Sequence, residues 1–177
     1  MYIAHPYEIL IKNKIIITGN PVRQGLINHN ISREKAIETF GLNPKKKTIL
    51  ILGGSLGART INQCLMENLE VIKQSEVQFI WQTGKIYINE AHAAYVKAGS
   101  PTMIHVTDFI SDMATAYQAA DLIISRAGAG SISEFCLLAK PVILVPSPNV
   151  AEDHQTQNAL ALVNKNAAIY VKDIEAK

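Results

Sequence analysis

Two glycines, two hydroxyls and a carboxylate follow one another where an apolar run gives way to a helical pattern, in the stretch IISRAGAGSISEF, residues 123–135. Glycine lets a backbone approach a ligand closely and adopt unusual torsion angles. The first amides of a helix point outward and favour anions. Ser131 and Glu134 also form the S-x-x-E pattern of a capping box. Glu134 therefore has two open roles, capping its own helix or accepting two hydrogen bonds from a vicinal diol such as a ribose.

A second junction of the same kind is ILGGSLGAR, residues 51–59. It is not a Walker A loop, because Gly-Lys-Ser/Thr is missing, and Ser55 stands where the dinucleotide fingerprint needs glycine. The next strand ends in Gln82 rather than in the acidic residue that holds an NAD ribose. The glycines allow either close approach to a ligand or a tightly packed turn, and Ser55 can donate to a phosphate. Two such junctions on one sheet edge favour a diphosphate.

Two further polar stretches fall at the same edge. TGNPVR, residues 18–23, ends in Arg23, which can pair with a phosphate or serve as a surface charge. DHQTQNA, residues 153–159, opens a helix for which Asp153 is the predicted N-cap. Amide side chains suit sugar hydroxyls because they donate and accept together, although a polar helix surface has the same composition. The polar residues concerned are His154, Gln155 and Asn158.

Composition excludes several classes of function. The net charge is +2 with 18% charged residues, and no basic stripe interleaves with aromatics, so nucleic-acid binding is not expected. The only basic block, residues 45–47, is either a solvated turn or a patch for phosphate or lipid headgroups.

The histidines have no ligand spacing, so no metal site is expected, and no nucleophile elbow is present. Cys64 and Cys136 are predicted to be reduced core residues. No apolar run reaches the ~18 residues of a membrane span.

Alternation of strand and helix patterns predicts the fold class. Short Val/Ile/Leu-rich runs typical of buried parallel strands occupy residues 48–54, 77–84, 103–110, 121–128, 141–148 and 167–173. Helical spacing occupies residues 58–72, 86–99, 112–120, 131–139 and 153–166, with Ser111 as the predicted N-cap of the third helix. The sequence therefore predicts an α/β domain with a doubly wound, Rossmann-like parallel sheet, whose ligand edge is the carboxyl end of the strands.

Five stretches together resemble one family, the MurG glycosyltransferases of bacteria, in glycosyltransferase family 28. They are TGNPVR, GGSLGAR, WQTG, FISDMATAYQAADLIISRAGAGSISE and DHQTQNA, and the resemblance runs from about residue 15 to residue 172. It implies the C-terminal, donor-binding half of a two-domain GT-B enzyme. Such enzymes transfer GlcNAc from UDP-GlcNAc to lipid I, making lipid II for peptidoglycan. They act peripherally at the cytoplasmic face of the bacterial plasma membrane, invert the anomeric centre, and use no essential metal or other cofactor.

The resemblance assigns part of the chain to the phosphates of the donor. Arg23 and Ser55 would contact the diphosphate region. The backbone amides of Ala129, Gly130 and Ser131 would meet the phosphates or the sugar.

It assigns other residues to the uridine and the sugar. The backbone of Ile110 would read the uracil edge, and Glu134 would hold the ribose diol, which tips the balance between its two roles toward the ribose. Gln155, together with His154, would read GlcNAc hydroxyls. No catalytic residue is expected in the chain, because the acceptor site and the general base of the family belong to the N-terminal half.

The domain prediction follows from what the resemblance leaves out. Residues 1–17 do not fit the strand–helix repeat and are predicted to lead in from a missing N-terminal domain. Residues 18–177 are predicted to form the UDP-GlcNAc-binding C-terminal domain, cut short at its own C-terminus. Lipid I would then be a partner only through the missing domain, and the chain alone would be inactive. Two alternatives stay open: a nucleotide-sugar-binding module of a two-chain transferase, and a GT-B relative such as a glycolipid synthase.

Overall fold

The computed structural model describes residues 19–27, 30–54 and 56–176, and it confirms the predicted fold class. Six strands form one sheet in the order β3-β2-β1-β4-β5-β6, and every neighbouring pair is parallel. This is the strand order of the Rossmann fold. The strands are β1 (Thr48–Leu52), β2 (Gln78–Gln82), β3 (Ile104–Thr107), β4 (Leu122–Ser125), β5 (Val142–Leu144) and β6 (Ile169–Tyr170).

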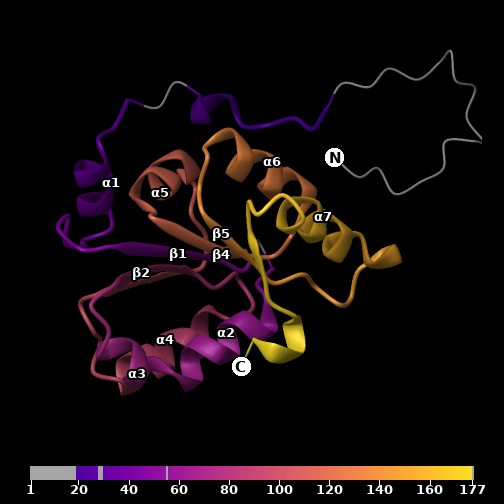
Figure 1. Cartoon of the computed structure of the whole chain (residues 1–177). Helices are drawn as coiled ribbons and strands as arrows, with labels where there is room; N and C mark the ends of the chain where they lie inside the picture. Colours follow the sequence, from indigo (N-terminus) through magenta and orange to yellow (C-terminus); the bar gives the residue numbers. More distant parts are fainter. Residues whose placement is uncertain (1–18, 28–29, 55, 177) are drawn as a thin grey trace, which may run out of the picture.

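Helices cover both faces of the sheet (Figure 1). One layer holds α1 (Arg33–Thr39), α5 (Met113–Ala119), α6 (Ala129–Leu137) and α7 (His154–Val163). The other holds α2 (Arg59–Glu67), α3 (Leu69–Lys73) and α4 (Ile88–Lys97). The short 3₁₀ turns are η3 (Gln24–Leu26), η4 (Ala151–Asp153) and η5 (Asp173–Glu175). Side chains alternate along β1, so Leu50 joins the first core and Ile51 the second.

The helix predicted over residues 58–72 is in fact two helices, with the break at Asn68. The Asn68 side chain donates through Nδ2 to the Cys64 carbonyl at 2.8 Å. Its backbone amide bonds instead to the Leu65 carbonyl at 3.2 Å, one residue short of the α-helical partner. An asparagine side chain that competes with its own backbone for a carbonyl in this way ends the helix.

Two smaller predictions are also wrong. The N-cap of α5 is Asp112 rather than Ser111, and the Asp112 carboxylate accepts a hydrogen bond from the Thr115 amide at 3.1 Å. Cys136 is exposed on α6 rather than part of the core, whereas Cys64 is half-buried on α2. Burial raises the pKa of the Cys64 thiol, so Cys64 stays protonated at neutral pH.

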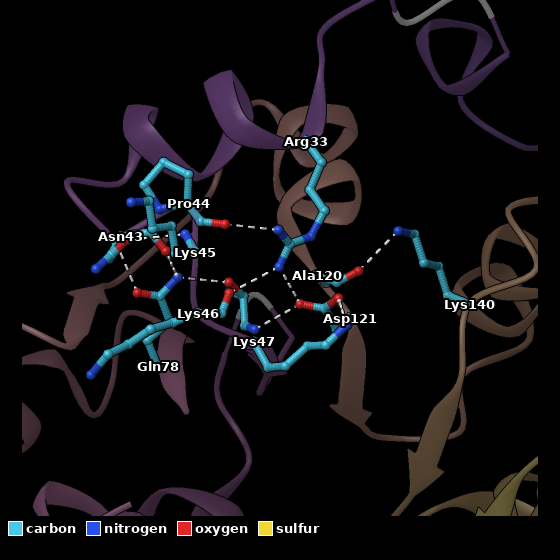
Figure 2. A network of polar contacts seen from close by, with 11 residues as sticks. Arg33, Asn43, Pro44, Lys45, Lys46, Lys47, Gln78, Ala120, Asp121 and Lys140 are labelled. Carbon is cyan, nitrogen blue, oxygen red and sulfur yellow. Dashed lines mark hydrogen bonds and ion pairs between the residues drawn. The ribbon is translucent and has the colours of Figure 1, made fainter. Parts of the chain in front are cut away.

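At the amino edge of the sheet, side chains tie the strand starts together (Figure 2). The Asp121 carboxylate, just before β4, accepts from the Thr48 amide at 2.8 Å, from Arg33 at 2.5 Å and from Lys47 at 3.0 Å. Gln78, at the start of β2, donates to the Thr48 hydroxyl and the Asn43 carbonyl, both at 2.9 Å. This edge therefore anchors α1 and the 43–47 turn to three neighbouring strands.

At the opposite, carboxyl edge, the strand order reverses between β1 and β4. Ligands of doubly wound sheets bind at such a switch point. The loops that follow these two strands are residues 53–58 and 126–128, the two junctions singled out in the sequence.

The predicted segment 1–17, Ser55 and Lys177 lie outside the described residues. Among the helices that the structure describes, none has the length and apolar character needed to cross a membrane.

Candidate functional site

A cavity of about 340 Å³ opens at the switch point. Arg23, Ile110, Ser131 and Gln155 line it, so four of the residues predicted to bind substrate meet in one place. A wider hollow of about 760 Å³ lies beside it and shares Gly54, Arg126 and Gln155 with it. The two spaces together extend from Met113 and Tyr117 of α5 to Gln155 near the start of α7.

Glu134 is the buried acidic residue of this region, with 6% of its surface exposed. Its carboxylate accepts hydrogen bonds from Arg23 Nη1, at 2.8 Å to Oε1 and 2.6 Å to Oε2, and from the Tyr117 hydroxyl at 2.7 Å to Oε2. The capping-box prediction for this residue is wrong. α6 begins at Ala129 with Gly128 at the N-cap, and no side chain caps it, so Glu134 lies too far along the helix to reach its first amides.

Tyr117 is a fixed donor to that carboxylate. It is 2% exposed and packs edge to face against Phe135, with ring centroids 5.8 Å apart. Burial, and then its hydrogen bond to Glu134, raise the pKa of the Tyr117 hydroxyl far above its usual value. Tyr117 therefore keeps its proton and its donor role throughout the physiological pH range.

Arg23 reaches Glu134 from a segment that is distant in sequence. Three residues earlier, Asn20 Nδ2 donates to the Ala129 carbonyl at 3.2 Å and to the Ser133 hydroxyl at 3.0 Å. These contacts hold residues 19–23 against the start of α6. The Arg23 side chain itself is 58% exposed. Its partner in this structure is a carboxylate, and its predicted contact with a phosphate stays a prediction.

The first turn of α6 carries the predicted amide donors. Ala129, Gly130 and Ser131 are its first three residues, and amides at those positions have no acceptor within their own helix. Neither Gly128 nor Gly130 has a positive φ, so the expectation of unusual torsion angles is wrong. A Cβ added at Gly130 would meet nothing within 4 Å. The space beside Gly130 is therefore open.

In the 53–58 loop, some glycines serve a tightly packed turn and another leaves room for a ligand, so each of the two interpretations holds for different residues. A Cβ on Gly84, after β2, would lie 2.2 Å from the amide nitrogen of Gly57, and Gly57 has a φ of +94°. These two glycines serve close packing of one backbone on another. Gly54, by contrast, lines both hollows and would contact nothing within 4 Å through a Cβ. Gly54 is thus the glycine of this loop that lines both hollows, whereas Gly53 and Gly57 line the wider one only.

Side chains of α7 hold the loop after β4 in place through hydrogen bonds. Gln155 Oε1 accepts from the Ala127 amide at 3.2 Å and from the Ser147 amide at 2.9 Å. Asn158 Nδ2, which is buried, donates to the Ala127 carbonyl at 3.1 Å. Asn158 is therefore a structural residue, and Gln155 has only its Nε2 group left to offer a ligand.

The start of α7 agrees in part with its prediction. Asp153 does occupy the N-cap position, but in a left-handed conformation with φ 51°, and its side chain makes no capping bond. The Asp153 carboxylate accepts instead from the Thr156 hydroxyl at 2.7 Å. His154 is the first helical residue and is partly buried.

Gln82 is a site residue whose role the sequence did not reveal. It is 4% exposed at the end of β2 and lines the smaller cavity. Its Oε1 accepts from the Ile110 amide at 3.0 Å and its Nε2 donates to the Gly54 carbonyl at 3.3 Å. Gln82 thus connects the loop after β1 with the segment after β3. Because Gln82 occupies the Ile110 amide, a ligand recognised by the backbone of Ile110 would have to use its carbonyl.

Arg126 is a second such residue. It lines both hollows, and its Nη1 donates to the Val145 and Pro146 carbonyls at 3.0 and 3.2 Å. It also pairs with Asp173 of η5, whose other oxygen accepts from the Thr60 hydroxyl at 2.7 Å. The sequence did offer a signal for Arg126, because it places an arginine between a strand and a glycine loop.

Within the described ranges, no group of three or more His, Cys, Asp and Glu side chains is arranged to hold a metal ion.

The family description "Glycosyltransferase family 28 C-terminal domain" matches residues 48–177. The chain belongs to glycosyltransferase family 28. The predicted resemblance is thereby confirmed, and the sheet with its switch-point site is the fold of a family 28 C-terminal domain.

Relatives of this family 28 chain are close. A Phocaeicola vulgatus protein named UDP-N-acetylglucosamine--N-acetylmuramyl-(pentapeptide) pyrophosphoryl-undecaprenol N-acetylglucosamine transferase is 79% identical over 166 residues, covering 94% of this chain and 44% of that protein. A Bacteroides fragilis protein of the same name is 71% identical, covering 93% of this chain and 44% of that protein. The chain therefore spans less than half the length of these relatives.

Solved structures agree on the fold of the family 28 domain. The crystal structure of Acinetobacter baumannii MurG superposes with a TM-score of 0.65 at 37% identity, covering 82% of this chain and 41% of that chain. A glycosyltransferase from Rickettsia africae superposes with the same TM-score of 0.65 at 19% identity, covering 94% of this chain and 45% of that chain. The second likeness concerns the fold alone.

Proposed function

We propose that the chain is the donor-binding domain of an inverting N-acetylglucosaminyltransferase that uses UDP-GlcNAc to convert lipid I to lipid II. The observation that carries the proposal is the near-identity, 79% over 166 residues, to the corresponding half of a protein that bears this activity in its name. The alternative of a glycolipid synthase has no comparable support. Lipid I and the cytoplasmic face of the plasma membrane would be engaged through the half that the relatives have in addition.

The geometry of the site supports binding of a nucleoside diphosphate. A buried carboxylate, Glu134, is suited to a ribose diol because it can accept two hydrogen bonds from adjacent hydroxyls. The amides that begin α6 and the loop at Gly54 lie at the same carboxyl edge of the sheet and suit phosphate oxygens. The Ile110 carbonyl is an acceptor of the kind that a uracil N3–H needs.

In this proposal the chain serves the leaving-group side of the reaction. Inverting transfer needs an acceptor hydroxyl on the face of the sugar opposite the departing UDP, with a base within ~2.6–3.2 Å of its proton. The amides of Ala129 to Ser131, Ser55 and Arg23 stabilise the charge that develops on the diphosphate. Gln155 Nε2 and His154 orient the sugar. The base and the acceptor surface come from the other half, and no step here runs through a metal.

Titration of the chain with UDP and UMP, followed by backbone chemical shifts, tests the donor site. We expect UDP to bind at least tenfold more tightly than UMP, because the β-phosphate adds charge-assisted hydrogen bonds, each contributing roughly 1.5–3 kcal/mol before ordering costs. The largest shifts should fall at residues 128–131 and at Ile110. Equal affinity for the two nucleotides would contradict a diphosphate site.

An activity assay tests the division of labour between the halves. We expect the 177-residue chain alone to form no lipid II from lipid I and UDP-GlcNAc, because positioning donor against acceptor accounts for ~7–11 kcal/mol of barrier reduction that one half cannot supply. Addition of the N-terminal half of a close relative should restore lipid II formation. Robust formation by the chain alone would contradict the proposal and call for a base within these residues.

A further inference from the structure

Arg23 occupies the carboxylate that the proposed function reserves for the ribose. A single guanidinium nitrogen, Nη1, lies 2.8 Å from Oε1 and 2.6 Å from Oε2 of Glu134, so it sits astride both oxygens. A vicinal diol that binds in a bidentate manner needs those same two oxygens. Ribose and Arg23 therefore compete for one acceptor group.

The two partners that Glu134 has in this structure differ in how readily they can leave. The Tyr117 ring is 2% exposed and its hydroxyl approaches Oε2 from within the core. The Arg23 side chain is 58% exposed, and Arg23 and Tyr117 both line the cavity, so exposure is what separates the two donors. The exposed Arg23 side chain can therefore leave Glu134 more readily than the buried Tyr117 hydroxyl can, and we expect the bond from Tyr117 to persist.

Arg23 stays near the site after it is displaced. Asn20 fixes its segment to α6 through the Ala129 carbonyl and the Ser133 hydroxyl. Arg23, three residues after Asn20, is thus held close to the first turn of α6, where Ser131 lines the cavity. A guanidinium released from Glu134 on this short tether is placed beside any phosphate that the amides bind, and arginine pairs well with phosphate.

We propose that Arg23 determines ligand specificity by exchanging partners, from Glu134 in the empty site to a phosphate in the occupied one. The inference rests on the proposed function, because it takes Glu134 as the ribose acceptor. A nucleoside without phosphate must break the Arg23–Glu134 ion pair and offers the arginine nothing in return. A nucleoside diphosphate breaks the same pair and supplies a new anionic partner. The exchange therefore selects against free uridine and in favour of UDP.

The test compares uridine and UDP binding in the wild-type chain and in Arg23→Met. If Arg23 competes with ribose, its removal should strengthen uridine binding at least threefold. The same substitution should weaken UDP binding at least tenfold, since the phosphate loses its cationic partner. The signature is a change of opposite sign for two ligands that share one nucleoside.

The matched control is Lys97→Met, which removes one positive charge from an exposed position in the last turn of α4. It should change both affinities by less than twofold and in the same direction. Arg23→Lys keeps the charge but loses the planar fork of donors, so it should fall between wild type and Arg23→Met for both ligands. It also provides the comparison should Arg23→Met fold poorly.

Two outcomes overturn the inference, and they are distinguishable. If the wild-type chain binds UDP more tightly than UMP but Arg23→Met leaves uridine affinity unchanged or lowers it, the exchange is wrong and the proposed function stands. If the wild-type chain prefers neither UDP nor UMP, the proposed function fails and the exchange fails with it.

Discussion

The two edges of the sheet are built in opposite ways. At the amino edge, charged and amide side chains close on the strand starts, and Asp121 alone accepts from a backbone amide, an arginine and a lysine. At the carboxyl edge, β1 and β4 run into glycine-containing loops, and Gly128 and Ser131 at the start of α6 line a cavity. The difference separates two tasks. Polar contacts at the amino edge join elements of the fold, whereas the carboxyl edge also leaves some polar groups, such as Gln155 Nε2 and the first amides of α6, for a ligand.

The Glu134 cluster stands between these two extremes. Its carboxylate accepts three hydrogen bonds, as that of Asp121 does, but from only two residues, Tyr117 and Arg23. Yet one of those donors, Arg23, is largely exposed. A carboxylate held on one side by a buried hydroxyl and on the other by a displaceable cation can serve both fold and ligand, and substitutions there should affect both.

The largest effect is expected from breaking the amino edge. Asp121→Ala leaves the Thr48 amide and the Arg33 guanidinium without their acceptor, which should lower the free energy of unfolding by about 2–4 kcal/mol. UDP affinity at low temperature, where the chain stays folded, should be unchanged. Urea unfolding and UDP titration measure the two quantities. Glu38→Ala, at an exposed position on α1, is the control and should be nearly neutral in both. A parallel loss of UDP affinity would contradict the separation of the edges.

The next effect concerns the intermediate cluster. Glu134→Gln keeps the shape but removes the charge and one acceptor oxygen, so UDP affinity should fall at least tenfold, about 1.4 kcal/mol. The preference for UDP over 2′-deoxy-UDP should shrink at the same time, because the lost contact is to the diol. Calorimetry with both nucleotides measures the ratio, with Glu90→Gln on the exposed face of α4 as the control. A variant that melts earlier but discriminates normally would make Glu134 purely structural.

A smaller effect should appear in the acid limb of stability. Burial by itself would raise the pKa of Asp121, but hydrogen bonds from Arg33, the Thr48 amide and Lys47 outweigh it and hold the pKa below its usual value. The stabilisation is then complete above the unfolded-chain pKa of about 4 and is lost as pH falls through the lower folded value. The stability difference between wild type and Asp121→Asn should accordingly narrow between about pH 5 and pH 2 in urea unfolding. A constant difference would count against it.

Two glycines of the carboxyl edge should respond in opposite ways to substitution by alanine, and Gly130→Ala should give the smallest change in stability. Gly130→Ala places a methyl group in open space on a helix, so the chain should become slightly more stable, by about 0.4–1 kcal/mol, while UDP binding weakens severalfold. Gly84→Ala should do the reverse to stability, since its Cβ would lie 2.2 Å from the Gly57 amide nitrogen. Thermal melts and UDP titrations of both variants measure this. Equal destabilisation by both would show that Gly130 also serves packing.

The strands were predictable because their signal is local. Runs such as residues 48–54 and 121–128 contain β1 and β4, and the remaining strands also fall within their predicted ranges. The Rossmann-like class, the carboxyl edge and the grouping of Arg23, Ile110, Ser131 and Gln155 around one cavity follow from that alternation and from the resemblance.

Contacts that depend on distant residues were not predictable. The S-x-x-E pattern indicated a cap at Ser131, but α6 begins two residues earlier, and Glu134 is instead paired with Arg23, 111 residues away in sequence. The break at Asn68 depends on a choice between two donors for one carbonyl, which helical periodicity does not encode. In the sequence, Gln82 served only to show that an acidic residue for an NAD ribose is missing. Its hydrogen bonds to Gly54 and Ile110 form only once the chain folds and brings these three segments together.

The pairing of β1 with β4 has a consequence for the order in which the chain assembles. Ile49 lies opposite Leu122, so this pairing closes a loop of roughly seventy residues, and the entropic cost of closure grows with loop length. Within that loop, β1, β2 and β3 pair with their nearest neighbours in sequence and can form first. The switch point is therefore a seam between an early and a late half of the domain. A chain emerging from the ribosome acquires the cavity at the switch point only when this longest-range strand contact is made.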